Sequence, residues 1–228
     1  MTARSRWAEV HLQHRFQDPE LLELALTHRS ASKRNNERLE FLGDAFLNYV
    51  VAQRLYAMRP DDNEGDLSRA RASLVNQATL AAIGREIGID KHLLLGRGEL
   101  RSGGAHRAAV LADALEAVIG AVLLDGGPAA AEGLVERLFA TRLEQLPSAA
   151  ELKDPKTRLQ EWLQGRGLTL PVYRVDSVCG REHEQTFTVV CEVEERDTRT
   201  IGRGRSRRIA EQEAAASMLM ELMRDDEG

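Results

Sequence analysis

The sequence predicts an all-α domain followed by a small α+β domain with the element order α-β-β-β-α. Apolar residues recur at helical spacing through the first two thirds of the chain, and a period of two replaces this pattern in the last third. The 228 residues, 43% of them hydrophobic, suffice for two domains with cores of their own. We therefore expect one domain at residues 1–147, a linker at 148–153 and a second domain at 154–224.

The spacing of apolar residues indicates five helices in the first domain, and no strand is expected there. Turn residues follow two of these helices, at Pro60–Gly65 and at Asp125–Pro128. The glycine-rich residues 96–107 are expected to form a loop. The expected helices cover about residues 21–27, 36–58, 66–87, 108–124 and 129–146.

The second domain begins at Asp154 and Pro155, which are typical of an N-cap and of the first position of a helix. A last helix is expected from about residue 206 to 223. Between the two helices, alternating apolar residues predict three strands, near residues 173–175, 187–193 and 198–201.

Several classes of protein are disfavoured by composition. No apolar run approaches the roughly 18 residues of a membrane span, and the polar N-terminus does not resemble a secretion signal. Two cysteines, Cys179 and Cys191, are too few for a disulfide framework, and their spacing does not suit a structural zinc site. We therefore expect a cytoplasmic protein with no membrane partner.

Acidic residues interrupt two of the apolar helical patterns. Three carboxylates share one stripe of the second expected helix, and two lie one turn apart in the most apolar helix: Glu37, Glu40 and Asp44, then Asp113 and Glu116. Carboxylates are seldom buried without a partner, and Mg²⁺ is the usual partner of all-oxygen ligands beside a phosphate. Solvated helix faces with arginine partners are the alternative, and Glu64, in an expected turn, is a weaker candidate.

A local basic segment contrasts with the net charge of −5, which by itself argues against a nucleic-acid partner. Residues 199–208 hold five arginines and no acid, and Ser206, Arg207 and Arg208 lie where a helix is expected to begin. Helix N-termini bind phosphate through free N–H groups and the helix dipole. Polar residues of the preceding helix and strand loop are further candidates for this surface, namely Thr157, Gln160, Glu161 and His183.

Six segments resemble the bacterial ribonuclease III family, over about residues 7–224. Those that resemble its nuclease domain are ALTHRS at Ala25–Ser30, NERLEFLGD at Asn36–Asp44, EGDLSR at Glu64–Arg69 and LADALEAVIG at Leu111–Gly120. Those that resemble its double-stranded RNA-binding domain are KTRLQE at Lys156–Glu161 and GRSRRIA at Gly204–Ala210.

The resemblance implies a homodimeric endoribonuclease that depends on Mg²⁺, for which Mn²⁺ substitutes. Its substrate is duplex RNA, read by A-form shape, and its products carry 5′-phosphate and 3′-hydroxyl ends with short 3′ overhangs. Precursor rRNA and mRNA are typical substrates of the family, and no small-molecule substrate is implied.

The resemblance also implies roles for individual residues. The metal ligands would be Glu40, Asp44, Asp113 and Glu116, of which Asp44 and Glu116 are the catalytic pair. Glu37 and Glu64 would assist from the rim of the cleft, and Phe41 would enter a socket on the partner subunit.

Two rival functions remain open at this point. A non-cutting RNA-binding protein on the same two domains is disfavoured because all six acidic positions are present. A small-molecule phosphohydrolase is disfavoured by the second domain. One position differs from the binding pattern of the family, because Ile209 stands where a third basic residue is common, and we expect a somewhat lower RNA affinity.

Overall fold

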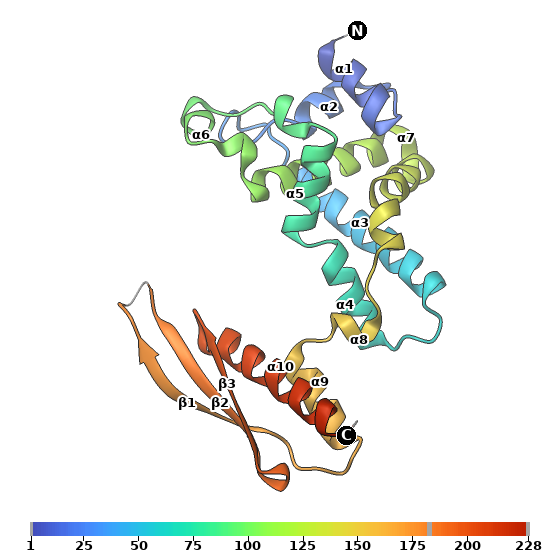
Figure 1. The fold of residues 1–228 in the computed structure, drawn as a ribbon. Coiled ribbons are helices and arrows are strands. Elements are labelled where there is room, and N and C mark those ends of the chain that lie inside the picture. Colours follow the sequence, from blue (N-terminus) through green and yellow to red (C-terminus); the bar gives the residue numbers. More distant parts are fainter. Residues whose placement is uncertain (1, 182–183, 227–228) are drawn as a thin grey trace. The chain divides into compact units, whose positions relative to one another are not determined.

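The structure is a computed structural model that describes residues 2–181 and 184–226. It divides into two compact units, residues 1–149 and 150–228 (Figure 1). The first unit is helical and the second combines three strands with two main helices, which confirms the predicted fold class.

The first unit contains helices of very different length, joined by short connections. Two of them, α3 and α7, form its centre. In chain order the helical segments are α1 Ala3–Trp7, η1 Ala8–Leu12, α2 Pro19–Ala25, α3 Glu37–Met58, α4 Glu64–Leu74, α5 Gln77–Glu86, η2 Ile89–Lys91, α6 Arg97–Arg101, η3 Gly104–His106 and α7 Ala108–Glu144, and α8 Ala149–Leu152 follows at the boundary between the units, within the expected linker.

Three details differ from the expectations for this unit. The helix expected over 66–87 is two helices, because the Asn76 side chain accepts a hydrogen bond from the Thr79 amide (2.9 Å) and begins α5. The loop expected at 96–107 contains the short helices α6 and η3. The N-terminal segments α1 and η1 have too few apolar residues for a periodic signal, yet Trp7 and Leu12 are buried.

Helix α7 is kinked at Gly127, within the segment Asp125–Pro128 where a break was expected. Gly127 has a left-handed conformation at φ 78°. Asp125 holds the N-terminal segment at this kink. Its carboxylate lies 2.7 Å from His14 Nε2 and accepts hydrogen bonds from the backbone amides of Gln17 and Asp18. The pKa of Asp125 is lowered because these hydrogen bonds outweigh the effect of its burial.

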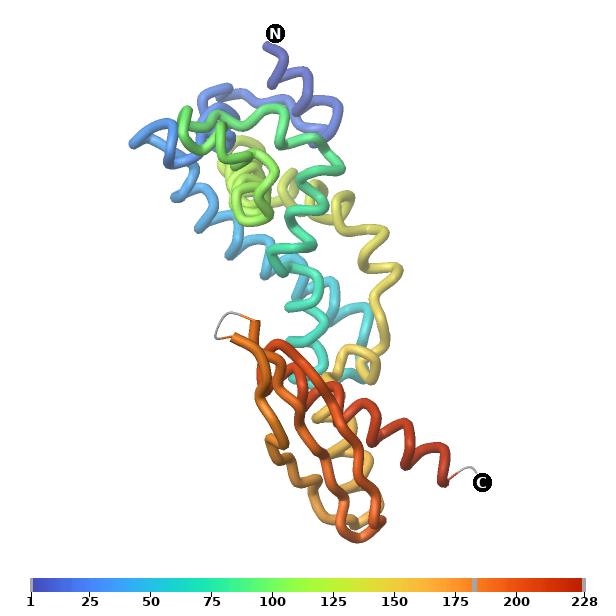
Figure 2. The backbone as a smooth tube through the Cα atoms, turned by 60° about the vertical axis from the view of Figure 1, so that its left-hand side comes forward, coloured from blue at the N-terminus to red at the C-terminus, as the bar shows by residue number. Residues whose placement is uncertain are grey.

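The second unit is a three-stranded antiparallel sheet, in the order β1-β2-β3, with α9 and α10 on one face (Figures 1 and 2). Its core includes Leu159 and Leu163 from α9, Cys191 and Val193 from β2, and Met218 from α10. As predicted, Asp154 caps α9 and Pro155 opens it. The elements are α9 Pro155–Gln164, β1 Val172–Cys179, β2 Thr186–Val193, η4 Glu194–Arg196, β3 Thr198–Gly204 and α10 Arg207–Asp226.

Among residues 2–181 and 184–226, no helix has the length and apolar character that crossing a membrane requires.

Candidate metal centre and nucleic-acid interface

Three carboxylates from two helices meet at the crossing of α3 and α7. Glu40 comes from α3, and Asp113 and Glu116 come from α7; each offers a ligand atom, and these atoms lie within 4.8 Å of one another. All three side chains are half-buried. Oxygen ligands in such a group suit a hard divalent cation.

Two glycines allow the helices to approach closely enough for this arrangement. A Cβ atom on Gly43 would overlap the backbone carbonyl of Glu116, and one on Gly120 would overlap the carbonyl of Leu39. The backbones of α3 and α7 therefore pack almost in direct contact, one turn from Glu40 and at Glu116 itself. The position of the acidic cluster depends on both glycines.

The carboxylates of the cluster repel one another. Burial, followed by the charges of Asp44, Asp113 and Glu40, raises the pKa of Glu116 to about 8. Burial and the neighbouring acids also raise the pKa of Glu40. Burial raises the pKa of Asp113 as well, although His28 and Arg29 partly counteract it. Positive charge is thus deficient at this point, and a bound divalent cation would supply it.

Asp44 and Glu37 lie on either side of the cluster along α3. Asp44 is exposed and accepts a hydrogen bond from Asn48 Nδ2 (2.7 Å); its charge contributes to the raised pKa of Glu116, but it is not among the three residues within 4.8 Å. Glu37, in the first turn of α3, accepts from Asn35 Nδ2 (3.1 Å) and lies 3.8 Å from Arg29. Both are therefore neighbours of the cluster.

Glu64 lies elsewhere in the unit. It begins α4, accepts a hydrogen bond from the Ser68 hydroxyl (2.7 Å) and lines a surface cavity of about 520 Å³ beside Ala52 and Tyr56 of α3. These α3 residues follow Glu40 by at least 12 positions, which is roughly 18 Å along a helix. A single chain therefore does not bring Glu64 to the acidic cluster.

Phe41 is 79% exposed although it follows Glu40 directly. Two other aromatic residues of α3, Tyr49 and Tyr56, are also exposed, at spacings of eight and seven residues that place all three on one face of the helix. This aromatic face of α3 is defined by Phe41, Tyr49 and Tyr56.

Four residues at or near the cluster were not predicted from the sequence as site residues. Gly43 and Gly120 set the helix separation, and their signal is a glycine in the middle of an apolar helical pattern. His28 and Arg29 lie near Asp113 and carried no periodic or spacing signal of their own, because the segment between α2 and α3 is irregular.

The start of α10 presents the predicted basic residues. Ser206 Oγ accepts a hydrogen bond from the Ile209 amide (3.3 Å), as expected of a capping serine. Arg207 pairs with Glu211 (2.8 Å), whereas Arg208 is exposed and has no hydrogen bond or ion pair within the described part of the chain. Arg208 is therefore the more accessible charge.

Two of the three predicted residues of α9 have partners within their own unit. Thr157 donates its hydroxyl hydrogen bond to Asp154 (2.8 Å), and Glu161 pairs with Lys153 (2.7 Å). Gln160 is exposed. His183, also predicted for this surface, lies outside the described residues.

Comparison with known proteins matches each unit to a family. Residues 18–143 match the family described as Ribonuclease-III-like, and residues 155–222 match the Double-stranded RNA binding motif. The chain is 54% identical to Ribonuclease 3 of Vibrio vulnificus strain YJ016 over 92% of this chain and 94% of the relative. It is 55% identical to Ribonuclease 3 of Nitrosococcus oceani, with 95% and 94% covered.

A solved structure gives the same indication for the first unit. The nuclease domain of ribonuclease III from Campylobacter jejuni, a structure described as flexible in a region involved in dimer formation, is 42% identical to this chain, with a TM-score of 0.59. The match covers 60% of this chain and 97% of that one. A second structure of that nuclease domain has a TM-score of 0.60 at 40% identity and covers 64% of this chain and 100% of its own.

The two matched units stand in the expected order, the relatives are matched over nearly their whole length, and the acidic cluster suits the divalent metal on which the family depends. The chain therefore belongs to the ribonuclease III family of endoribonucleases that act on double-stranded RNA.

Proposed function

We propose that this chain cleaves duplex RNA at the acidic cluster, with Glu40, Asp44, Asp113 and Glu116 holding Mg²⁺, for which Mn²⁺ substitutes. The observation that carries the proposal is the group of three carboxylates within 4.8 Å on α3 and α7. A divalent cation in such a site activates the attacking water and neutralises charge on the phosphate. Hydrolysis leaves 5′-phosphate and 3′-hydroxyl ends, and two staggered cuts leave short 3′ overhangs.

Two carboxylates of the site, Glu116 and Asp44, have surroundings that suit a metal ligand. The Glu116 carboxyl, with a pKa of about 8, would give up its proton to a bound cation, because the positive charge would offset the burial and the neighbouring carboxylates that raise the pKa. Asp44, which accepts a hydrogen bond from Asn48, would be the fourth residue to hold the cation. In this proposal Asp44 and Glu116 are the two carboxylates that act directly on the scissile bond.

The aromatic face of α3 supports a homodimer. In a two-fold interface a surface meets its own copy, and Tyr49 lies midway between Phe41 and Tyr56 along α3. An axis at Tyr49 would bring Phe41 of one subunit to the cavity beside Tyr56 of the other. Because Glu64 lines that cavity, Glu64 of the partner subunit would then reach the rim of this cluster, with Glu37 on the other side of it.

The second unit, residues 154–224, would hold the duplex, and residues 148–153 would link it to the nuclease unit at 1–147. Its contacts to A-form RNA are proposed at α9, the strand loop and the start of α10, through Thr157, Gln160, Glu161, His183, Ser206, Arg207 and Arg208. Precursor rRNA and mRNA in the cytoplasm are the proposed substrates.

Glu116→Gln tests the cleavage proposal. With long duplex RNA and Mg²⁺, we expect kcat to fall by more than about 100-fold, beyond the range typical of residues outside the ligand set. Duplex binding, measured without Mg²⁺, should be unchanged. Glu144→Gln, an exposed acid of the same helix, is the control and should cleave normally.

Cleavage by Glu116→Gln at the wild-type rate would refute the site. Binding without any cleavage by the wild-type protein would favour the non-cutting RNA-binding alternative, and hydrolysis of small phosphate esters without action on duplex RNA would favour a phosphohydrolase.

Phe41→Glu tests the dimer. We expect the wild type to sediment at twice the chain mass of 25.3 kDa and the variant to sediment as a monomer at micromolar concentration, because the change would bury a negative charge beside the acidic side chains of Asp62 and Glu64. Val10→Glu, an exposed apolar residue of η1, should leave the dimer intact. A dimeric Phe41→Glu variant would contradict the proposed interface.

A further inference from the structure

One glutamine side chain joins α10 to the start of α9. The Gln212 amide nitrogen Nε2 donates a hydrogen bond to Asp154 Oδ1 (2.9 Å), and Gln212 Oε1 accepts one from the backbone amide of Lys156 (3.2 Å). Asp154 is the N-cap of α9 and also accepts the hydrogen bond of the Thr157 hydroxyl (2.8 Å). The two helices are therefore connected close to the proposed RNA contacts of each.

A second connection between the same helices is made by charged groups. Glu211 accepts hydrogen bonds from Lys156 Nζ (2.7 Å) and from Arg207 Nε (2.8 Å), so one carboxylate links a cation of α9 to the first residue of α10. Lys156 Nζ also lies 4.2 Å from the centre of the Tyr173 ring. Because Tyr173 of β1 pairs with the buried Cys191 of β2, the sheet supports the same lysine.

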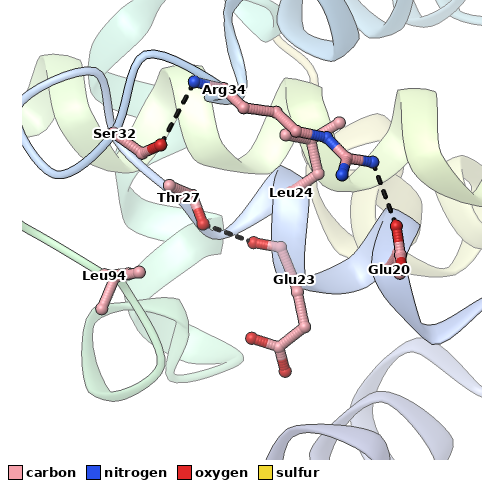
Figure 3. Close-up of a pocket in the computed structure, with 7 residues that line it drawn as sticks. All are labelled: Glu20, Glu23, Leu24, Thr27, Ser32, Arg34 and Leu94. Carbon is pink, nitrogen blue, oxygen red and sulfur yellow. Dashed lines mark hydrogen bonds and ion pairs between the residues drawn. The ribbon is translucent and has the colours of Figure 1, made fainter.

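The burial of Glu211 distinguishes this contact from an ordinary surface ion pair. Arg34 and Glu20 of the first unit form a single contact of 3.1 Å, and both side chains are 73% exposed (Figure 3). The Glu211 side chain is 13% exposed and has two cationic partners. Exposed pairs contribute little to stability, whereas two charge-assisted hydrogen bonds to one partly buried carboxylate restrict the geometry of both donors. Glu211 therefore fixes the start of α10 relative to α9.

These contacts set the spacing between two proposed RNA-binding elements. An A-form duplex presents its minor grooves and the phosphates between them at fixed separations, and a double-stranded RNA-binding domain contacts both. Thr157 and Gln160 of α9 can contact the duplex together with Ser206 and Arg208 of α10 only if the two helices have the matching separation. A single strand imposes no such separation, because its flexible backbone adapts to either element.

We propose that Glu211 is a positioning residue that determines specificity for duplex RNA, because it holds Lys156 and Arg207 together and so keeps the start of α10 at the distance from α9 that a duplex requires. This rests on the RNA contacts of the proposed function. Glu211 is an anion and repels phosphate. Loss of its charge should therefore strengthen RNA binding if only charge matters, and weaken duplex binding if position matters.

Duplex and single-stranded RNA of equal length test the proposal, with the full-length protein in the absence of Mg²⁺. Glu211→Gln removes the charge and keeps the shape, whereas Glu211→Asp keeps the charge and shortens the side chain. We expect both changes to weaken duplex binding roughly 10-fold, without weakening the binding of the single strand. In cleavage with Mg²⁺, KM for the duplex should rise and kcat at saturating RNA should stay at the wild-type value.

Two further variants control for charge and for direct contact. Glu221→Gln removes the same charge from α10 about 15 Å further along the helix and should bind both RNAs like the wild type. Lys156→Met removes the ammonium group and keeps an unbranched chain beside Tyr173. Combined with Glu211→Gln, it should weaken duplex binding no further than either change alone, because both remove the same contact. Fully additive losses would contradict the proposal.

The remaining outcomes separate the role of Glu211 from the proposed RNA contacts. Tighter duplex binding by Glu211→Gln, or equal losses for duplex and single strand, would refute the role of Glu211. A Glu211→Gln variant that binds neither RNA would also refute it, because Glu211 would then maintain the fold of the unit. If Arg208→Ala binds duplex RNA like the wild type, the start of α10 does not contact RNA, and the proposed RNA contacts themselves fail.

Discussion

The acidic cluster of the first unit and the paired carboxylates of the second unit have pKa values shifted in opposite directions. In the first unit, Glu40, Asp113 and Glu116 are half-buried with too little positive charge around them, and the pKa of each is raised, first by burial. In the second unit, burial also opposes ionisation of Glu211, but hydrogen bonds from Lys156 and Arg207 outweigh it and lower the pKa. Asp154 behaves in the same way, through Gln212 and Thr157.

This difference separates acids whose charge is used within the fold from acids that are candidates for metal binding. Asp154 caps α9 and joins it to α10 through Gln212 (2.9 Å), so its charge is used within the unit. The carboxylates at the crossing of α3 and α7 have no comparable partners among the described residues. A carboxylate whose pKa is raised beside other acids is a candidate for metal binding, whereas a paired one is structural.

The largest expected effect comes from separating the two helices of the first unit. Gly43→Ala would place a methyl group on the carbonyl of Glu116, so α3 and α7 must move apart. We expect a loss of about 3 kcal/mol in the free energy of unfolding, together with loss of metal binding. Urea denaturation and metal calorimetry measure the two effects.

Gly98→Ala is the matched control, because nothing lies within 4 Å of its added methyl group. If Gly43→Ala keeps the wild-type stability and metal affinity, the close approach of the helices does not build the cluster.

A smaller effect is expected at the start of α10 in the second unit. Arg207→Ala combined with Arg208→Ala should weaken duplex binding near physiological salt and leave kcat at saturating RNA unchanged. Each lost phosphate contact should flatten the log–log salt dependence of affinity by about 0.7–0.9. Because Arg207 is paired with Glu211, most of the loss should already appear in Arg208→Ala.

Filter binding at several salt concentrations measures these slopes, and Arg224→Ala, at the other end of α10, is the control. An unchanged slope in the double variant would mean that the start of α10 does not contact phosphate.

Many of the helices and strands in the two units were predictable from the sequence, because they depend on local patterns of residues. Apolar spacing predicted α3 and the first part of α7, and the pair Asp154–Pro155 predicted the start of α9. Period-two alternation predicted β2 and β3, which have buried residues, and the beginning of β1, whose residues are exposed or half-buried.

The rest depends on packing between distant segments. Each acidic residue could be identified from the sequence as a candidate. Which of them come together in space depends on the close packing of α3 and α7, where Gly43 lies against the carbonyl of Glu116. Helical spacing grouped Asp44 with Glu40, and it gave no means to place Glu64 at the far end of α3. The Ser30 hydroxyl, which contacts His28, accepts a hydrogen bond from the Gly96 amide across 66 residues of chain, and no periodic pattern predicts that contact.

The smallest expected effect is a difference in how the two units respond to pH without metal. The pKa of Glu116 is about 8 in the folded protein against an ordinary value of 4.5, so the folded state binds more protons than the unfolded state between these values. Stability must therefore fall as pH rises from about 4.5 to 8. The lowered pKa values of Asp154 and Glu211 act in the opposite direction, because their contribution is present at neutral pH and is lost in acid.

Discounted for the partial solvent access of Glu116, the effect on the first unit is on the order of 1–2 kcal/mol. Denaturant unfolding in EDTA at about pH 5.5 and about pH 8, in the lower part and at the upper end of the interval over which the stability falls, measures this effect. Glu116→Gln, which cannot ionise, should be the more stable protein at the higher pH and should lose most of the pH dependence, while Glu144→Gln should keep it. Saturating Mg²⁺ should restore the stability of the wild-type protein at the higher pH, because the cation would supply the positive charge that is missing around the three carboxylates. If the stabilities of wild type and Glu116→Gln show the same pH dependence in EDTA, the pKa of Glu116 is not raised as described. The contrast between the two units would then rest on the raised pKa values of Glu40 and Asp113 alone.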